Sequence, residues 1–97
     1  MTPVVWTYSA QDDLEAIQAN LRRVSERAAD ALPSRLIVRS QPLENQPRMG
    51  RQIPEFDDEL LRELIEGEYR ILYEVFPDRV EVWGIAYGRQ QLIKERP

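Results

Sequence analysis

Two runs of β-branched and aromatic residues, 69–76 and 79–87, limit most strongly what this chain can fold into. Such runs favour β-strands, and only the dipeptide Pro77-Asp78 separates them. A two-residue link joins antiparallel strands into a hairpin. The sequence therefore predicts that these two strands are antiparallel neighbours in a sheet.

Side chains alternate between the two faces of a strand, so each run divides into two sets. In the first run the sets are Tyr69, Ile71, Tyr73 and Val75 against Arg70, Leu72, Glu74 and Phe76. In the second run they are Val80, Val82, Gly84 and Ala86 against Glu81, Trp83, Ile85 and Tyr87. The small set of the second run favours close packing of helices on that face. Because both faces carry apolar residues, the other face must be covered by something or stay partly exposed.

The first half of the chain is expected to supply the helices. Residues 4–8 are β-prone and predict a first strand. Ser9, followed three residues later by Asp12, predicts a capped helix start. Apolar residues then recur at intervals of three and four, which predicts one core-facing stripe made of Leu14, Ile17, Leu21, Val24 and Ala28.

A second helical pattern is interrupted by Pro33 and Pro42, because proline lacks the N–H that a helix interior needs. Its apolar positions are Ala29, Leu32, Leu36 and Leu43. Pro33 can begin a new helix over roughly residues 34–41, or it can bend a continuous helix, and the pattern leaves both alternatives open.

Turn residues divide the next part of the chain. Residues 45–50 predict a loop, residues 51–53 a short extended piece that ends at Pro54, and residues 55–59 an acidic, solvated loop. Residues 60–67 fit a helical face as well as a strand. Together these patterns predict an α+β fold, with two N-terminal helices on one face of a mostly antiparallel sheet.

Length and composition exclude several classes of protein. A chain of 97 residues fits a single domain, 1–97, and it contains no cysteine and no histidine. Disulfides, thiolate metal sites, Ser-His-Asp triads and Cys-His dyads are thereby excluded, and we expect no metal and no other cofactor. Neither an 18-residue apolar run nor a secretory signal is visible, so we expect a cytoplasmic location and no membrane partner.

The charge of the chain favours protein partners. Its net charge of −4 disfavours broad contact with nucleic acid, because lysine and arginine supply most non-specific affinity for phosphate. Twelve of the 13 basic residues are arginine, the exception being Lys94. Arginine suits bidentate recognition of either carboxylate or phosphate, so composition alone leaves both uses open.

Four segments of the second half, in this order and at this spacing, resemble the RelE/ParE family of small bacterial type II toxins, nearest its ParE branch. They are residues 50–55, 61–67, 69–75 and 80–89. The resemblance covers nearly the whole chain and implies one strand, two helices and then three or four strands. It also implies that residues 60–67 form a strand that ends at Gly67.

The resemblance implies a toxin of a toxin–antitoxin pair, with two activities on one scaffold. ParE toxins, known from plasmid stabilisation, bind DNA gyrase without cleaving a substrate, whereas RelE toxins are ribosome-dependent mRNA endonucleases. Either would be neutralised by a cognate antitoxin, ParD-like or of another type, whose partly disordered C-terminal region folds onto the toxin. No direct nucleic-acid partner is expected outside the antitoxin complex. The acidic net charge favours a third alternative, a non-toxic member that only binds its antitoxin.

Sheet-end residues are expected to meet the target or the antitoxin, and they are Arg51, Arg62, Arg70, Tyr87 and Arg89. On the nuclease alternative the catalytic residues would be Glu55, Arg70, Tyr87 and Arg89. Cleavage needs a base for the 2′-hydroxyl, an acid for the leaving oxygen and cations for the phosphate. The set is incomplete, because residues 88–97 contain no tyrosine or histidine where RelE nucleases carry one. A gyrase inhibitor needs no catalytic residue.

The same residues also have ordinary structural interpretations. Arg70, with Glu63 or Glu74 near it in the expected sheet, fits an ion pair on the sheet face as well as a target contact. Gly88-Arg89 fits a turn glycine followed by an exposed arginine. Aromatic residues such as Trp83 are more typical of a core than of a binding platform.

Overall fold

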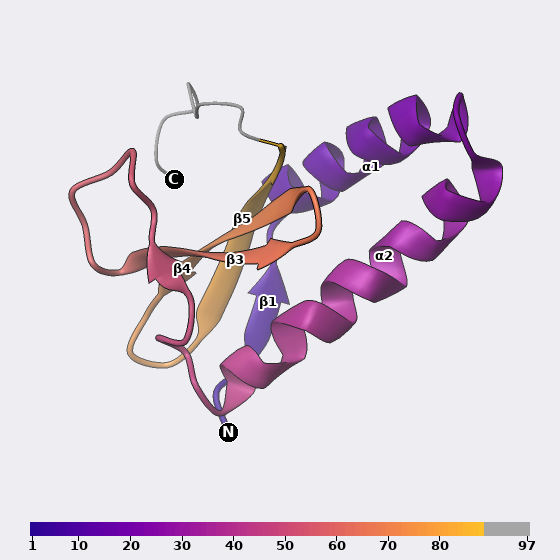
Figure 1. The fold of residues 1–97 in the computed structure, drawn as a ribbon. Coiled ribbons are helices and arrows are strands. Elements are labelled where there is room, and N and C mark those ends of the chain that lie inside the picture. The colour runs from indigo at the N-terminus through magenta and orange to yellow at the C-terminus, as the bar shows by residue number, and fades with distance from the viewer. Residues whose placement is uncertain (89–97) are drawn as a thin grey trace.

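The computed structural model describes residues 1–88, which form a five-stranded sheet with two helices on one face (Figure 1). The strands are β1 (Val4–Trp6), β2 (Arg51–Gln52), β3 (Leu61–Glu66), β4 (Tyr69–Val75) and β5 (Val80–Tyr87). The helices are α1 (Tyr8–Arg22) and α2 (Glu26–Ser40), and α2 runs into the 3-10 turn η1 (Gln41–Glu44). The strand order is β1-β5-β4-β3-β2, and among these strands only the β1–β5 pair is parallel. The expected α+β fold is confirmed, including a strand within residues 60–67.

The first helix begins two residues earlier than the sequence predicts. Thr7 has an extended backbone, and its side-chain oxygen accepts the N–H of Ala10 at 3.2 Å. Ser9 lies within the first helical turn, so the predicted cap at Ser9 is wrong. The first strand is also shorter than residues 4–8, because Thr7 donates its N–H to Val82 of β5 and the chain then turns into α1.

The break between the two helices precedes Ser25 and does not fall at Pro33. Val24 is 84% exposed, and Ser25 caps α2 by accepting the N–H of Ala28 at 3.1 Å. The single apolar stripe predicted through Val24 and Ala28 is therefore wrong, because α1 ends just after Leu21. No helix among residues 1–88 has the length and apolar character needed to cross a membrane.

Pro33 lies inside α2, which continues through it. Proline at this position cannot donate an N–H to the carbonyl of Ala29, four residues earlier. Gln18 of α1 supplies the missing donor, because its Nε2 lies 2.7 Å from the Ala29 oxygen. Of the two alternatives that the sequence leaves open, the structure has the single helix.

Two apolar clusters lie on opposite faces of the sheet. The helix-side cluster joins residues of α2, such as Leu36, to the strands and includes Ile71 and Tyr73 of β4. The second cluster consists of Ile53, Leu61, Leu72, Trp83 and Ala86, with Phe56 packed against it. Ile53 and Phe56 belong to the loop between β2 and β3. This loop covers much of the second face, whereas Ile65 of β3, on the same face, stays 45% exposed. Both of the expected alternatives, a cover and a partly exposed apolar surface, are therefore present on this face.

A β-bulge in β5 changes which of its side chains share a face. Leu72 pairs with Gly84 whereas Tyr73 pairs with Val82, so Trp83 is an extra residue in β5. The helix-side cluster accordingly contains Val80, Val82 and Ile85, and the second cluster contains Trp83 and Ala86. The predicted division of residues 79–87 into two faces is wrong beyond the bulge, because a bulge reverses the alternation.

Candidate functional site

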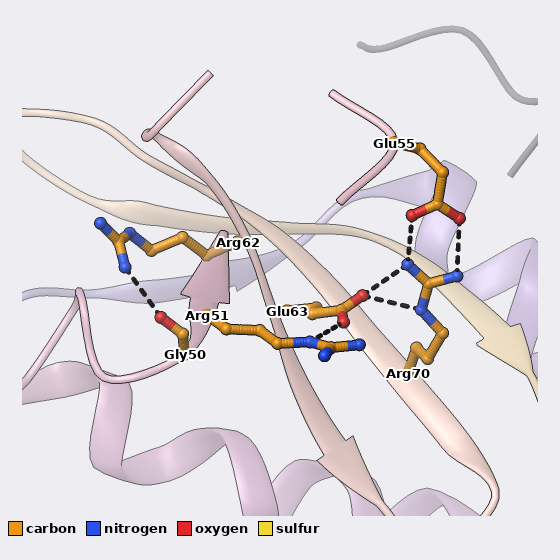
Figure 2. Close-up of polar contacts among 6 residues, drawn as sticks. All are labelled: Gly50, Arg51, Glu55, Arg62, Glu63 and Arg70. Carbon is orange, nitrogen blue, oxygen red and sulfur yellow. Dashed lines mark hydrogen bonds and ion pairs between the residues drawn. The ribbon is translucent and has the colours of Figure 1, made fainter. Parts of the chain in front are cut away.

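Arg70 is the centre of a buried ion cluster on the sheet face away from the helices, as Figure 2 shows. Its Nε donates to Glu63 Oε1 at 2.7 Å, and its Nη2 lies 2.6 Å from the same oxygen. Its Nη1 and Nη2 donate to the two carboxylate oxygens of Glu55 at 3.0 and 2.8 Å. One guanidinium is therefore shared between a carboxylate of a strand and a carboxylate of a loop.

Strand register brings the first pair together. Glu63 of β3 pairs with Leu72 of β4, and Ile65 of β3 pairs with Arg70. Glu63 and Arg70 are therefore diagonal neighbours on one face of an antiparallel pair, within reach of long side chains. Of the two ion-pair partners that the sequence suggests for Arg70, the structure has Glu63.

Arg51 completes the cluster from β2. It pairs in register with Glu63, and its Nε donates to the second carboxylate oxygen of that residue. The Glu63 side chain is 0% exposed, whereas that of Arg51 is 63% exposed. A buried carboxylate is costly unless it is paired and hydrogen-bonded, and Glu63 has a cation at each oxygen. Two arginines and two glutamates thus balance one another.

Arg70 is held in its charged form. Hydrogen bonding to Glu55 raises the pKa of Arg70 above its ordinary value, with burial acting against this and Glu63 adding to it. At neutral pH the group is a fixed cation that can bind an anion, and it cannot act as a general base.

A cavity of about 710 Å³ lies beside this cluster. Among the described residues its charged lining comes from Arg51, Glu55, Glu68 and Arg70. Its apolar lining includes Pro54 and Ile65. Within residues 1–88 no group of three histidine, cysteine, aspartate or glutamate side chains is placed to hold a metal ion. The arrangement is that of a polar recess with two arginines, one of them buried.

Arg62 lies outside the cluster, as the separation in Figure 2 makes clear. Its Nη1 donates to the backbone oxygen of Gly50 at 2.8 Å and to that of Arg48 at 3.3 Å. It therefore holds the loop that leads into β2. The prediction that Arg62 and Arg70 share one surface is not what the structure has, because adjacent residues of β3 alternate between faces and Glu63 is the one that faces Arg70.

Tyr87 is separated from Arg70 by the sheet. Its ring packs edge-on against Tyr69 with the centroids 5.3 Å apart, and Tyr69 belongs to the helix-side cluster. The Tyr87 side chain is 53% exposed. Arg89, the remaining predicted site residue, lies outside the described residues. Of the predicted set, the structure brings together Arg51, Glu55 and Arg70.

Glu63 organises the site, although the sequence predicts it only as one of two ion-pair partners for Arg70. The signal that could have identified it is an acid that alternation places on the same strand face as Leu61 and Ile65, because an acid on a buried face needs a cation nearby. Glu55 was expected in a solvated loop, and this expectation is wrong, because 15% of its side chain is exposed and both its oxygens contact Arg70.

Comparison with known proteins settles the family. Residues 4–92 match the family described as the ParE toxin of the type II toxin–antitoxin system parDE. The chain belongs to the ParE toxin family. The resemblance seen in the sequence, nearest the ParE branch, is thereby confirmed. Among curated protein sequences nothing matches.

Two solved structures share the fold of this ParE family member. A chain of the chromosomal ParDE system of P. aeruginosa is 20% identical, with a TM-score of 0.76, and the match covers 92% of this chain and 98% of that one. A chain of the RelBE2 toxin–antitoxin complex of Mycobacterium tuberculosis is also 20% identical, with a TM-score of 0.57 and coverage of 89% and 96%. At this identity the likeness concerns the fold.

Proposed function

We propose that this ParE-like toxin of a type II toxin–antitoxin system inhibits DNA gyrase by binding it, and that a cognate antitoxin neutralises it. The family match over residues 4–92 supports the assignment to a toxin that binds its target. Gyrase works on DNA in the bacterial cytoplasm, so the proposal places the toxin there. The net charge of −4 agrees with a protein target, because it disfavours broad contact with nucleic acid.

The pairing of Glu55 with Arg70 is the observation that favours a toxin that binds its target over a nuclease. A nuclease needs a base that accepts the proton of the 2′-hydroxyl, but both Glu55 oxygens accept hydrogen bonds from Arg70. Tyr87, the other candidate for proton transfer, lies on the helix side of the sheet. The base, acid and cation of a ribonuclease therefore do not converge among residues 1–88.

The supercoiling of relaxed plasmid by gyrase and ATP tests this proposal. The purified toxin should stop supercoiling in a dose-dependent way. Arg51→Ala removes an exposed cation beside the cavity and should weaken inhibition by about tenfold, the loss of roughly one charge-assisted hydrogen bond. Arg48→Ala is the matched control, since Arg48 is similarly exposed and its contact with Glu59 is a loose 3.8 Å. Undiminished supercoiling at a large excess of toxin would reject gyrase as the target.

For the antitoxin we propose the outer surface of α2. Ile37 and Val38 are 44% and 61% exposed, and Val38 lines a cleft of about 500 Å³ together with Pro42 and the stem of Arg39. Val38 and Pro42 are four residues apart and line the same cleft, which suits the apolar face of an amphipathic segment. Both solved relatives come from toxin–antitoxin systems, which agrees with an antitoxin partner.

Co-expression with the product of the neighbouring gene tests the antitoxin surface. Val38→Asp should abolish co-purification and the relief of growth arrest, because it puts a charge into the apolar contact. Val24→Asp, the same substitution at an exposed valine between the two helices, should leave both intact. An unaffected complex with the Val38 variant would reject this surface.

A further inference from the structure

Glu63 and Glu55 hold Arg70 from two different kinds of position. Glu63 projects from β3, is 0% exposed, and is also held by Arg51. Glu55 belongs to the loop between β2 and β3, is 15% exposed, and lines the cavity of about 710 Å³ that Arg70 also lines. One carboxylate is built into the sheet, and the other is at the boundary between Arg70 and the cavity.

We infer that Arg70 is a carboxylate-binding site that Glu55 closes from within the chain, and that an acidic side chain of a partner protein enters the cavity and takes the place of Glu55. The inference rests on the proposed function in one respect, namely that the toxin acts on a protein. Glu63 and Arg51 remain in place and keep the Arg70 fork oriented during the exchange.

The exchange leaves Arg70 paired with a carboxylate throughout, and it adds one negative charge to the cavity. Arg70 gives up one carboxylate and gains another, so no buried cation is left without an anion, which would be costly. The released Glu55 carboxylate turns into the cavity and is hydrated there. The loop backbone need not move, because its neighbours on either side are anchored: Ile53 is 0% exposed, and the Phe56 ring packs against Trp83 with the centroids 6.2 Å apart.

The lining of the cavity favours a protein acid over a nucleic-acid phosphate. Pro54 and Ile65 offer apolar surface next to Arg70, which suits an aspartate or glutamate flanked by apolar residues. Glu68 lines the same cavity, and its charge would repel a phosphate backbone. A single carboxylate, bound by the outer nitrogens of Arg70, is repelled less by Glu68 than a phosphate backbone with several charges would be.

Chemical rescue of Glu55→Ala by acetate tests the site. The variant lacks the internal carboxylate, so acetate should bind Arg70 and raise the melting temperature by about 4 °C or more relative to chloride at equal ionic strength. The unaltered toxin should show a shift of less than about 1 °C, because Glu55 already fills the site. Should Glu55→Ala fail to fold, Glu55→Ser also leaves the place beside Arg70 open and is measured in the same way.

Two matched variants make the result specific. Glu63→Ala also loses a carboxylate at Arg70, but Glu63 is 0% exposed, so acetate should not rescue it. Glu59→Ala, in the same loop and 72% exposed, should neither lower the melting temperature nor respond to acetate.

Equal stability of Glu55→Ala in acetate and chloride, or equal rescue of Glu63→Ala, would overturn the inference. So would a variant that binds a DNA oligonucleotide but not acetate. None of these measurements uses gyrase, so they stand apart from the test of the target.

Discussion

The side-chain amide of Gln18 donates to the backbone carbonyl of Ala29 at 2.7 Å, and this is the carbonyl that Pro33 leaves without its helical donor. One helix thus repairs a defect in the other, and α2 passes through a proline without ending. The contact ties the middle of α1 to α2.

The first prediction concerns this repair. Gln18→Ala should lower the free energy of unfolding by about 1 to 2 kcal/mol, because it leaves the Ala29 carbonyl without a donor. In a Pro33→Ala background the helix supplies its own N–H to Ala29, so the same substitution should cost less than about 0.5 kcal/mol. Urea unfolding of the four proteins measures the difference. Equal costs in both backgrounds would show that Gln18 does not compensate for Pro33.

The second prediction concerns Glu63. Glu63→Ala should lower the free energy of unfolding by about 3 kcal/mol or more, because it leaves the buried side of Arg70 uncompensated. Arg51→Ala removes the exposed partner of the same carboxylate and should cost about 1 kcal/mol or less, since 63% of that side chain is in water. Urea unfolding of both variants is the measurement, and a cost for Glu63→Ala no larger than that for Arg51→Ala would contradict the assignment of Glu63 as the organiser.

The third prediction concerns alkaline pH. Burial raises the pKa of the Tyr73 hydroxyl above its ordinary 10.0, a shift that the backbone N–H of Gly50 partly opposes. A raised folded-state pKa means that the folded protein holds this proton more tightly than the unfolded chain. The stability it provides is complete below pH 10 and is lost as the pH rises above 10 toward the folded-state pKa.

Tyr73→Phe separates this effect from the others. The variant should be less stable at neutral pH by about 1 kcal/mol, because the N–H of Gly50 loses its acceptor. Its stability should then fall less steeply above pH 10 than that of the unaltered protein. Unfolding free energies measured from about pH 8 to about pH 11 provide the comparison. Parallel curves for the two proteins would remove Tyr73 as the source of the alkaline decline.

The fourth prediction compares two glycines with left-handed backbones. Gly67 and Gly88 have φ of +58° and +64°, so alanine is strained at either position, at a cost of about 1 to 2 kcal/mol. At Gly67 a Cβ would also lie 2.5 Å from Arg35 Nη2, whereas at Gly88 it would meet none of the residues that the structure describes within 4 Å. The end of the Arg35 side chain is flexible and 47% exposed, so it can move away at small cost. Gly67→Ala should therefore be slightly the more destabilising in thermal unfolding, and this small excess should vanish in an Arg35→Ala background. An excess that persists without Arg35 would contradict this account.

Local patterns predicted the strands β4 and β5 and the α+β class correctly, whereas the strand within residues 60–67 was predicted from the family resemblance. The hairpin of β4 and β5 follows from β-propensity and a two-residue link, both of which are properties of neighbouring residues. The helix start was missed by two residues because Thr7 and Ser9 are both good caps, and only the point where the chain leaves the sheet decides between them.

What the sequence could not predict depends on residues far apart along the chain. Pro33 signals a break unless a donor such as Gln18 arrives from another helix. The bulge at Trp83 changes which side chains of β5 share a face, and the pattern of residue types along the strand does not predict it. The covering of the second sheet face depends on the path of the loop that carries Glu55.

The residues of the site, like the elements of the fold, could be predicted from the sequence only in part. Arg70 could be identified from the resemblance to the RelE/ParE family, and Glu63 as one of two acids near it in the expected sheet. Glu55 looked like one more acid in a solvated loop, because its contact with Arg70 needs the loop to fold back over the sheet. The sequence gives no reason to prefer Arg51 over Arg62 or Tyr87 as a neighbour of Arg70. Strand register and the alternation of side chains place only Arg51 beside Arg70.

Primer extension on mRNA bound to programmed ribosomes tests most directly whether the tied Glu55–Arg70 pair leaves this toxin without nuclease activity. After incubation with an excess of the purified protein, the message should remain full-length. Transcripts cut by the purified protein, with cleavage lost in Glu55→Gln, would contradict the account and make the pair catalytic.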